Sequence, residues 1–597
     1  MPVVAVSAKR LNQLLGREYP MKELVHALDQ LGCDVEDTAE MNLYRCPACQ
    51  SPNEKLSHEE PAARCDFCGF ESDEPFPLNA TERVIRLDLL ADRPDLFDAG
   101  GLSRALKGYL GLEKGLTEFQ MKKGDIKVEV DPALSEKGTY RPYIACAVVE
   151  TPPMDQDSLR EIMRLQENLH WGIGRDRKLA SIGVYDMDTI VPPIRYTLVD
   201  PESFLFHPLG VPGQNMTPHQ ILAEHPKGKA YAGLMDEYSR CPILIDSRDL
   251  VLAMPPIINS DETKCKTGTT RLFIDVTGAV PGPVYNSLNT LVSALIELGG
   301  RAETVTILHP GGPEKTPDLS PKSIAVRYDK ARRWLGLDFS RREFVDFLEK
   351  MRLDVEEKDD AYLVHYPVFR TDVRHEVDIF EDAAIGYGYE NIPPRLVESL
   401  TIGEARPEER ISQTVRDAMT GLGFTEIMTL NLHSKERLFG KFRMEPGSEH
   451  IVVQNPKTIQ QKVVRCHLMP GIMETFQKNR RKPVPQKIFE LGNILTLNSE
   501  AETGVEEYRH LAFGIIGPES GYAGGRSVLD AVLSELGLKG AYKPASHPSF
   551  FEGRCAEVTD QNSGWLARLG EVHPEVITNF SLAYPILLCE LRLWKVI

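Results

Sequence analysis

Apolar side chains near the amino terminus recur with the spacing of one buried helix face. Leu24, Leu28 and Leu31 stand at positions i, i+4 and i+7 of one segment, which predicts an amphipathic helix. The pair Leu15-Gly16 marks a turn before that helix, and a short stretch of alternating apolar and polar residues precedes the turn. We therefore expect a small α+β module at this end of the chain.

The same pattern returns farther along the chain without a gap. Segment 326–356 matches segment 6–36 at an offset of 320 residues, and both end in Asp-Val-Glu. Phe344, Leu348 and Met351 occupy the three helical positions in the second copy. Because solenoid repeats follow one another at short periods, two copies this far apart indicate duplicated modules that flank another domain. Chance similarity between two amphipathic helices is the alternative.

The first copy of the module is longer than the second. Asp95, in ADRPDL, aligns with Asp372, in FRTDV, at an offset of 277 residues, so the first copy carries 43 extra residues. These extra residues lie between about Glu36 and Arg93. The first module therefore contains an insertion.

Two CxxC pairs lie within this insertion, at positions Cys46, Cys49, Cys65 and Cys68. Fifteen residues separate the pairs, a spacing at which four thiolates can surround one Zn²⁺. Polar residues fill the link, so metal binding would supply stability that the link lacks. Four cysteine ligands close the coordination shell, which predicts a structural zinc ribbon rather than a catalytic metal. A redox role of the CxxC pairs is the alternative.

Length and composition indicate a multi-domain globular protein. The chain has 597 residues, of which 42% are hydrophobic and 26% charged, and this length predicts three to five domains. No apolar run approaches the roughly 20 residues of a membrane span, and the amino terminus lacks the features of a signal peptide, so we expect a cytoplasmic protein. The net charge of −18 argues against a protein that coats nucleic acid non-specifically.

Acidic side chains gather in the second copy. A helix that starts near Glu376 would place three acids at i, i+3 and i+4 on one face, with a fourth in the preceding turn. Oxygen ligands of this kind suit Mg²⁺. The alternative is a set of helix-terminal acids favoured by the dipole, with Arg370 and Arg374 as counter-charges, and the residues alone do not decide between the two. The four acids are Asp372, Asp378, Glu381 and Asp382.

Several segments resemble the β subunit of phenylalanine–tRNA ligase, in its archaeal/eukaryotic form. They include FRTDVRHEVDIFEDAAIGYGYENIPP, ADRPDLFDAGGLSRALKGYLG, MPPIINSDETKCKTGTTRLFIDVTG and LMPGIMETFQKNRRKPVPQKIFELGNIL. The resemblance runs nearly end to end and implies that the four acids hold Mg²⁺. The zinc ribbon departs from the usual family pattern.

The resemblance also implies an editing domain that hydrolyses tyrosine wrongly attached to the phenylalanine tRNA. Such a site is needed because a pocket for phenylalanine rejects an isostere with one added hydroxyl only weakly. Our candidates are Asp275 and Thr277, which strand alternation turns to the same side, together with Asn259 and Ser260. For each of the four, a turn or strand-edge polar residue is the alternative.

The family layout implies a multi-domain α+β fold of four parts. These are an N-terminal module at 1–120 with the ribbon at about 41–80, an editing domain at 121–315, a B5-like module at 316–398, and a class II synthetase-like domain at 399–597. The last part is an antiparallel sheet with helices, and the surroundings of Arg465 do not rebuild a nucleotide pocket. The resemblance therefore implies an α₂β₂ heterotetramer in which the α subunit binds ATP and charges tRNA(Phe). A free-standing deacylase and a zinc-ribbon RNA-binding protein are the competing hypotheses.

Overall fold

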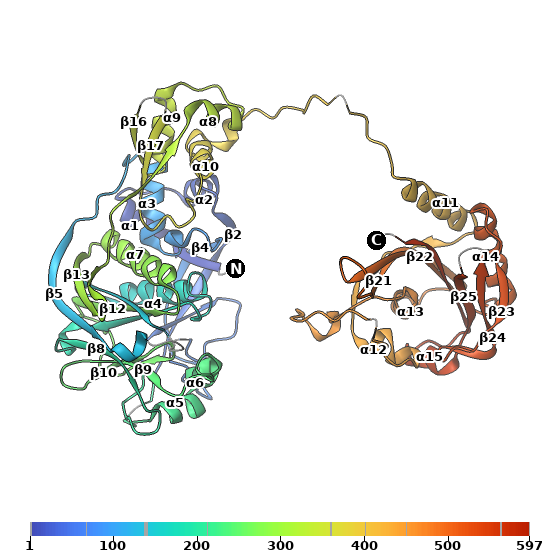
Figure 1. Cartoon of the computed structure of the whole chain (residues 1–597), viewed down its shortest axis with the longest axis horizontal. Helices are drawn as coiled ribbons and strands as arrows, with labels where there is room; N and C mark the ends of the chain where they lie inside the picture. Colours follow the sequence, from blue (N-terminus) through green and yellow to red (C-terminus); the bar gives the residue numbers. More distant parts are fainter. Residues whose placement is uncertain are drawn as a thin grey trace. The chain divides into compact units, whose positions relative to one another are not determined.

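The computed structural model describes residues 3–66, 68–135, 141–211, 213–358, 361–399, 401–448, 450–560 and 564–595. The chain forms two compact units, Met1–Arg395 and Leu396–Ile597 (Figure 1). Both units mix helices with sheets, so the predicted α+β multi-domain class is confirmed. Within the described residues, no helix is long and apolar enough to cross a membrane.

The N-terminal module is a four-stranded sheet, in the order β1-β4-β2-β3, with three helices. Its apolar helix faces enter one large core that also contains residues of the rest of the first unit, Leu24 and Leu28 among them. The elements are β1 (Val3–Ser7), α1 (Ala8–Leu15), α2 (Met21–Gln30), β2 (Asp34–Arg45), β3 (Pro52–Leu56), β4 (Leu78–Asp88) and α3 (Ala99–Tyr109).

The second module has the arrangement that a repeat of the first module predicts. Its sheet order, β15-β17-β16, corresponds to β1-β4-β2. Helices α8 and α9 have the lengths of α1 and α2 and lie 320 residues after them. The elements are β15 (Lys322–Val326), α8 (Tyr328–Leu335), α9 (Arg341–Lys350), β16 (Asp354–Lys358), β17 (Ala361–Tyr366) and α10 (Glu376–Tyr387).

The insertion extends the hairpin of the first module. Strands β2 and β4 have 12 and 11 residues, where β16 and β17 have 5 and 6. Strand β3 and all four cysteines of the CxxC pairs lie between the ends of β2 and β4. The extra residues therefore build a ribbon that leaves the topology of the module unchanged.

Between the modules lies a ten-stranded mixed sheet, in the order β11-β10-β9-β8-β5-β13-β6-β12-β7 with β14 beside β13. Helix α7 packs on β6, β12 and β7, and α4 packs on α7 and β7. The elements are β5 (Met121–Val130), β6 (Tyr143–Glu150), α4 (Gln156–Trp171), β7 (Ala180–Asp186), β8 (Ile194–Val199), α5 (Pro218–Glu224), α6 (Pro226–Tyr231), β9 (Cys241–Ile245), β10 (Val251–Met254), β11 (Ile258–Asn259), β12 (Arg271–Gly278), α7 (Pro281–Glu297), β13 (Arg301–His309) and β14 (Gly312–Thr316).

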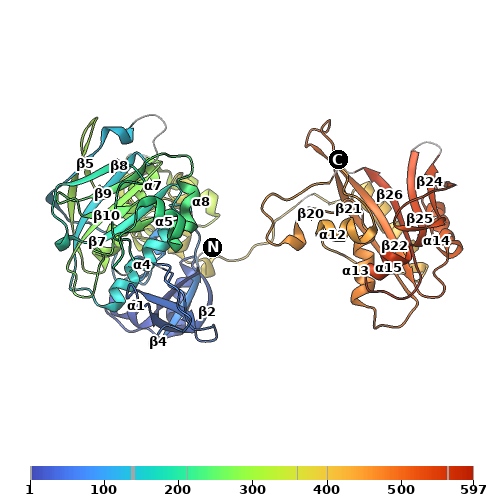
Figure 2. The same cartoon turned by 90° about the horizontal axis from the view of Figure 1, so that it is seen from below.

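The second unit is built on a seven-stranded sheet in the order β18-β21-β22-β26-β25-β24-β23, antiparallel except for the pair β18 and β21. Figure 2 shows its long central strands side by side. Helix α13 leads directly into strand β21 of this sheet. The elements are α11 (Pro407–Gly421), β18 (Thr425–Glu426), β19 (Leu432–His433), α12 (Lys435–Leu438), β20 (Val463–Val464), α13 (Met469–Lys478), β21 (Gln486–Leu497), β22 (Val505–Ile516), α14 (Tyr522–Glu535), β23 (Ala541–Pro544), β24 (Phe550–Asp560), β25 (Gly564–Val572), α15 (Pro574–Asn579) and β26 (Ile586–Lys595).

Candidate functional site

Strand β12 carries two of the candidate residues on one face of the middle sheet. Ile274 and Val276 enter the core beneath α7, so Asp275 and Thr277 point to the opposite face, as strand alternation predicts. Both polar side chains are buried, with 1% and 0% of their surface exposed. Buried polar groups of this kind require partners.

Asp275 finds its partner on the neighbouring strand β7. The hydroxyl of Tyr185 donates a hydrogen bond of 2.5 Å to Asp275 Oδ1. Gly183 lies opposite Asp275 in the ladder, and a Cβ there would fall 2.4 Å from Asp275 Oδ1. Burial raises the pKa of Asp275 to about 6, although the bond from Tyr185 and the charge of Arg141 favour the carboxylate. The carboxyl group therefore titrates close to neutral pH.

Thr277 has a structural partner of its own. The fully buried Arg141 donates from Nε to Thr277 Oγ1 at 3.3 Å and from Nη2 to Ser181 Oγ at 3.0 Å. Arg141 also donates to the carbonyl of Arg177 at 2.9 Å. Thr277 thus helps to hold a buried guanidinium. A pocket lies beside Asp275, and Thr277 is not one of the residues that line it.

That pocket is lined in part by the edge strand β7, and its space between protein atoms is about 880 Å³, part of which is open to solvent. Helix α4, strand β7 and the segment 253–259 form its walls. Asp275 and Asn259 both line it, whereas the fully buried Ser260 lies behind the wall, where its hydroxyl accepts from the amide of Glu262. The fold therefore unites two of the four candidates in one cavity.

The wall also contains polar residues that the sequence patterns did not single out. Arg177 donates to Glu167 at 2.7 Å and to the carbonyls of Pro256 and Ile257. Although burial opposes ionisation, this guanidinium lowers the pKa of Glu167. Arg177 and the two residues before it, in the GRDRK turn, all have positive φ. This conformation is uncommon for non-glycine residues. A run of charged residues after Gly174 was the signal available in the sequence.

The four cysteines of the ribbon converge as predicted. All are buried, and their Sγ atoms lie within 4.8 Å of one another. Cys46 and Cys68 are 3.8 Å apart at Sγ, and Cys49 and Cys65 are 3.6 Å apart. Tetrahedral sulfurs about 2.3 Å from Zn²⁺ stand roughly 3.8 Å from one another, so the cluster fits zinc in size and in ligand type.

The two CxxC knuckles have matching backbone geometry. The amides of Cys46 and Cys65 donate to the carbonyls five residues ahead, at 3.0 and 2.8 Å. Gln50 and Gly69, which follow each pair, both have positive φ, 63° and 79°. Beside them the buried Asn53 donates from Nδ2 to Cys65 Sγ, with 3.7 Å between the two atoms. This hydrogen bond is the kind that orients a metal ligand.

In the acidic segment of the second module, an arginine side chain forms ion pairs with two of the four acids. Arg370 pairs with Asp372 at 2.7 Å and with Asp382 at 2.9 Å. Asp378 accepts from two backbone amides at the start of α10, at 2.7 Å each, and burial raises the pKa of Glu381. In the described part of the chain, only the four cysteines bring three or more ligand atoms close enough to share an ion. Mg²⁺ at these acids stays a prediction, and Arg370 supplies the positive charge in the arrangement observed.

The second unit holds Arg465 in an internal ion pair. Its Nη1 lies 2.6 Å from Glu490 Oε1, and both side chains are buried. Its Nε donates to the carbonyl of Asn493 at 2.8 Å. Two of its donors are therefore engaged by protein groups.

Comparison with known proteins agrees with this architecture. Residues 324–389 match the family model of the tRNA synthetase B5 domain, and residues 392–593 match that of the phenylalanyl tRNA synthetase beta chain CLM domain. A phenylalanine–tRNA ligase beta subunit of Methanosphaera stadtmanae is 34% identical over 100% of both chains. That of Methanosarcina barkeri is 38% identical over 86% of this chain and 92% of its own.

A solved structure covers the first part of the chain. The N-terminal fragment of the phenylalanyl-tRNA synthetase beta subunit from Pyrococcus horikoshii has a TM-score of 0.55 and 34% identity, and the match covers 65% of this chain and 99% of the fragment. Likeness therefore extends over the sequence, the family models and the fold. The chain belongs to the phenylalanine–tRNA ligase β-subunit family, and is a subunit of an aminoacyl-tRNA ligase complex.

Proposed function

We propose that this β subunit hydrolyses tyrosyl-tRNA(Phe) in the pocket beside Asp275, while a partner α subunit attaches phenylalanine to tRNA(Phe) with ATP. The observation that carries the proposal is a buried carboxyl group, with a pKa of about 6, in the wall of a cavity. Perturbed acids in clefts are typical of functional sites. The complex would be a cytoplasmic α₂β₂ heterotetramer.

Asp275 is suited to recognise the hydroxyl of a misattached tyrosine. Its Oδ1 already accepts from Tyr185, so Oδ2 is the acceptor available to a ligand hydroxyl. Phenylalanine has no hydroxyl and would leave that buried oxygen without a partner. A site built to bond a substrate hydroxyl can reject the analogue that lacks it by about 10⁴-fold, which protects correctly charged tRNA from hydrolysis.

The hydrolysis itself breaks the ester bond between tyrosine and the terminal ribose. Water attacks the ester carbonyl, and free tyrosine and uncharged tRNA are released. Asn259 is half-buried in the pocket wall, and its amide can orient the water or the carbonyl oxygen. Thr277 would act indirectly, through its hydrogen bond with Arg141. Ser260 would act through its hydrogen bond with the backbone amide of Glu262.

The synthetic reaction belongs to the α subunit in this proposal. The ion pair of Arg465 with Glu490 supports this division, because an arginine paired inside the protein does not neutralise the phosphates of ATP. We further propose that the second unit packs against the α subunit, that the cysteines hold a structural Zn²⁺, and that any Mg²⁺ at the acidic segment must displace Arg370.

The test combines two assays on the purified chain, alone and after co-expression with its α subunit. We expect ATP–pyrophosphate exchange with phenylalanine only in the complex, and hydrolysis of tyrosyl-tRNA(Phe) that Asp275→Ala abolishes. Exchange by the isolated chain would contradict the division of labour. Unchanged hydrolysis in Asp275→Ala would remove the editing assignment, while hydrolysis by a chain that binds no α subunit would favour a free-standing deacylase. Tight RNA binding that required only the ribbon would favour the zinc-ribbon hypothesis.

A further inference from the structure

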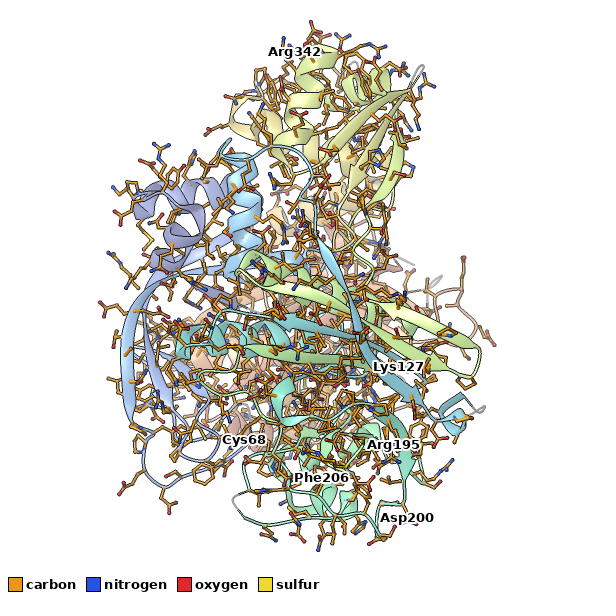
Figure 3. All side chains as sticks on the ribbon, turned by 90° about the vertical axis from the view of Figure 1, so that its left-hand side faces the viewer. Cys68, Lys127, Arg195, Asp200, Phe206 and Arg342 are labelled. Atoms are coloured by element: carbon orange, nitrogen blue, oxygen red, sulfur yellow. The ribbon has the colours of Figure 1, made fainter. Side chains whose placement is uncertain are left out.

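We propose that the second zinc knuckle, here residues 65, 66, 68 and 69, is part of the frame of the deacylation pocket, so that zinc binding sets the position of the pocket rim. The expected effect on catalysis rests on the proposed function. The contacts between the knuckle and the pocket do not depend on that function. It assigns to the ribbon a role in the hydrolytic reaction. Figure 3 labels Cys68 in the knuckle and Phe206 in the rim segment 206–211.

The rim segment touches the knuckle at a glycine. A Cβ on Gly210 would lie 2.5 Å from Cys68 Cβ and 2.9 Å from Cys68 Sγ, closer than real side chains approach. Gly210 also has a φ of +87°, a conformation that glycine adopts without strain. The rim therefore rests directly on a zinc-ligating cysteine.

Leu209 transmits this contact to the pocket. Its side chain packs against the core of the ribbon and also lines the pocket. Its amide donates to the carbonyl of Asn259 at 2.9 Å, and its carbonyl lies 3.1 Å from His225 Nε2. His225 Nδ1 accepts from the amide of Lys227, so Nε2 carries the proton and donates to Leu209. The rim residue is thus bonded on one side to the candidate Asn259 and on the other to helix α6.

A second path starts from the neighbouring glycine of the knuckle. A Cβ on Gly69 would lie 2.6 Å from Pro226 Cβ, at the first turn of α6. Tyr231, at the other end of α6, lies beneath the guanidinium of Arg177, with 4.5 Å between its ring centroid and Arg177 Cζ. Arg177 lines the pocket and pairs with Glu167. Two contacts therefore connect the knuckle with the pocket wall, one through Leu209 and one through helix α6 and Arg177.

Metal is required for this frame because the ribbon has little core of its own. Four of the seven buried members of its apolar cluster are the cysteines themselves. Metal binding supplies the folding free energy of small sites of this kind. Loss of zinc would remove the support that Cys68 gives to Gly210 and that Gly69 gives to Pro226. A misplacement of about 1 Å in a catalytic site can slow a reaction about 100-fold.

The experiment compares the αβ complex before and after zinc is removed with a zinc-selective chelator, and again after Zn²⁺ is restored. Hydrogen exchange at the Leu209 amide reports on the rim, deacylation of tyrosyl-tRNA(Phe) on the pocket, and phenylalanylation on the synthetic site. The variant Gly210→Ala tests the contact in the presence of zinc. Gly213→Ala is its matched control, because Gly213 also has positive φ, +69°, but has nothing within 4 Å of the added Cβ.

We expect zinc removal and Gly210→Ala to speed exchange at Leu209 and to lower deacylation at least about tenfold, with phenylalanylation unchanged. Gly210→Ala should keep one zinc per chain, and Gly213→Ala should behave like the wild type. Unchanged exchange and unchanged deacylation after zinc removal would overturn the proposal. If exchange rises but the wild type does not deacylate tyrosyl-tRNA(Phe), the frame stands and the proposed function fails.

Discussion

Arg93 Nε lies 4.0 Å from Asp372 Oδ1, so the first module contributes a cation to the acidic segment of the second. Each module pairs an arginine with the aspartate two residues later, Arg93 with Asp95 and Arg370 with Asp372. The duplication has thus produced two equivalent ion pairs that meet where the modules pack. Charges buried in this way need one another, because a buried ion without a partner is costly.

Removal of Arg370 should destabilise the protein strongly. Arg370→Met leaves the buried Asp382 without its counter-charge, a change that typically costs about 3–5 kcal/mol of unfolding free energy. If the acids bind Mg²⁺, the ion should restore part of the lost thermal stability of this variant. Calorimetry with and without Mg²⁺ measures both effects, and Arg374→Met is the control because Arg374 is exposed. Full stability of Arg370→Met without Mg²⁺ would contradict the role given to Arg370.

The amide variant of Asp275 should separate folding from hydrolysis. Asp275→Asn keeps the shape of the side chain and can still accept from Tyr185, but it lacks the charge. We expect deacylation of tyrosyl-tRNA(Phe) to fall about 100-fold, by analogy with other lost charge-assisted hydrogen bonds in active sites, and phenylalanylation to stay at its wild-type rate. Steady-state deacylation kinetics of the αβ complex test this, and a rate within twofold of wild type would exclude an essential carboxylate.

The stability of the middle domain should fall as pH rises through the titration of Asp275. The pKa of Asp275 in the folded chain is about 6 and that of an unfolded aspartate is about 3.9. The unfolded chain therefore releases its proton first, and stability is lost between about pH 4 and pH 6. The loss is about 3 kcal/mol. Exchange of the β12 amides in denaturant should show this loss in the wild type and not in Asp275→Asn; parallel pH profiles would refute it.

Removal of the Tyr185 hydroxyl should move the pH profile of deacylation. The Tyr185 bond favours the carboxylate form of Asp275, so Tyr185→Phe should raise the pKa of Asp275 further. We expect the acidic limb of the rate profile to shift to higher pH, with activity near wild type at pH 8. A general loss of activity at every pH would instead indicate that the ring had moved.

Asn53 should tune zinc affinity without supplying a ligand. Asn53→Ala removes the donor to Cys65 Sγ, and loss of such a partner typically weakens metal binding about 10- to 100-fold. Competition with a chromophoric chelator measures the change. Asn42→Ala is the control, since Asn42 accepts from Thr81 on the exposed side of the ribbon sheet. Equal affinities of the two variants would show that the Asn53 bond does not orient the ligand.

Patterns within short segments predicted the modules well. The amphipathic spacing that begins at Leu24 and returns at Phe344 is a local property, and helices α2 and α9 follow it because their apolar faces need the same core. The CxxC pairs are local too, since each knuckle closes through its own backbone bonds. Alternation along β12 likewise placed Asp275 and Thr277 on one face.

Contacts between distant segments could not be read in the same way. The sequence left Arg370 as one of two counter-charges beside a possible metal, and only the packing of Arg370 against Asp372 and Asp382 showed which acids it neutralises. Ser260 and Asn259 are neighbours in the chain, yet only Asn259 lines the pocket. A shift of one residue along an extended chain turns a side chain to the opposite face, and this decides whether it reaches the pocket.

The sequence by itself determined the duplicated modules, the ribbon cysteines, the buried strand that carries Asp275 and the membership of the family, because periodicity, spacing and resemblance are properties of the linear chain. Only the tertiary structure decided that Tyr185 bonds Asp275, that Arg141 supports Thr277, and that the ribbon meets the pocket rim at Gly210. These contacts join segments tens to more than a hundred residues apart. Their geometry depends on how sheets and loops pack together, which no local pattern specifies.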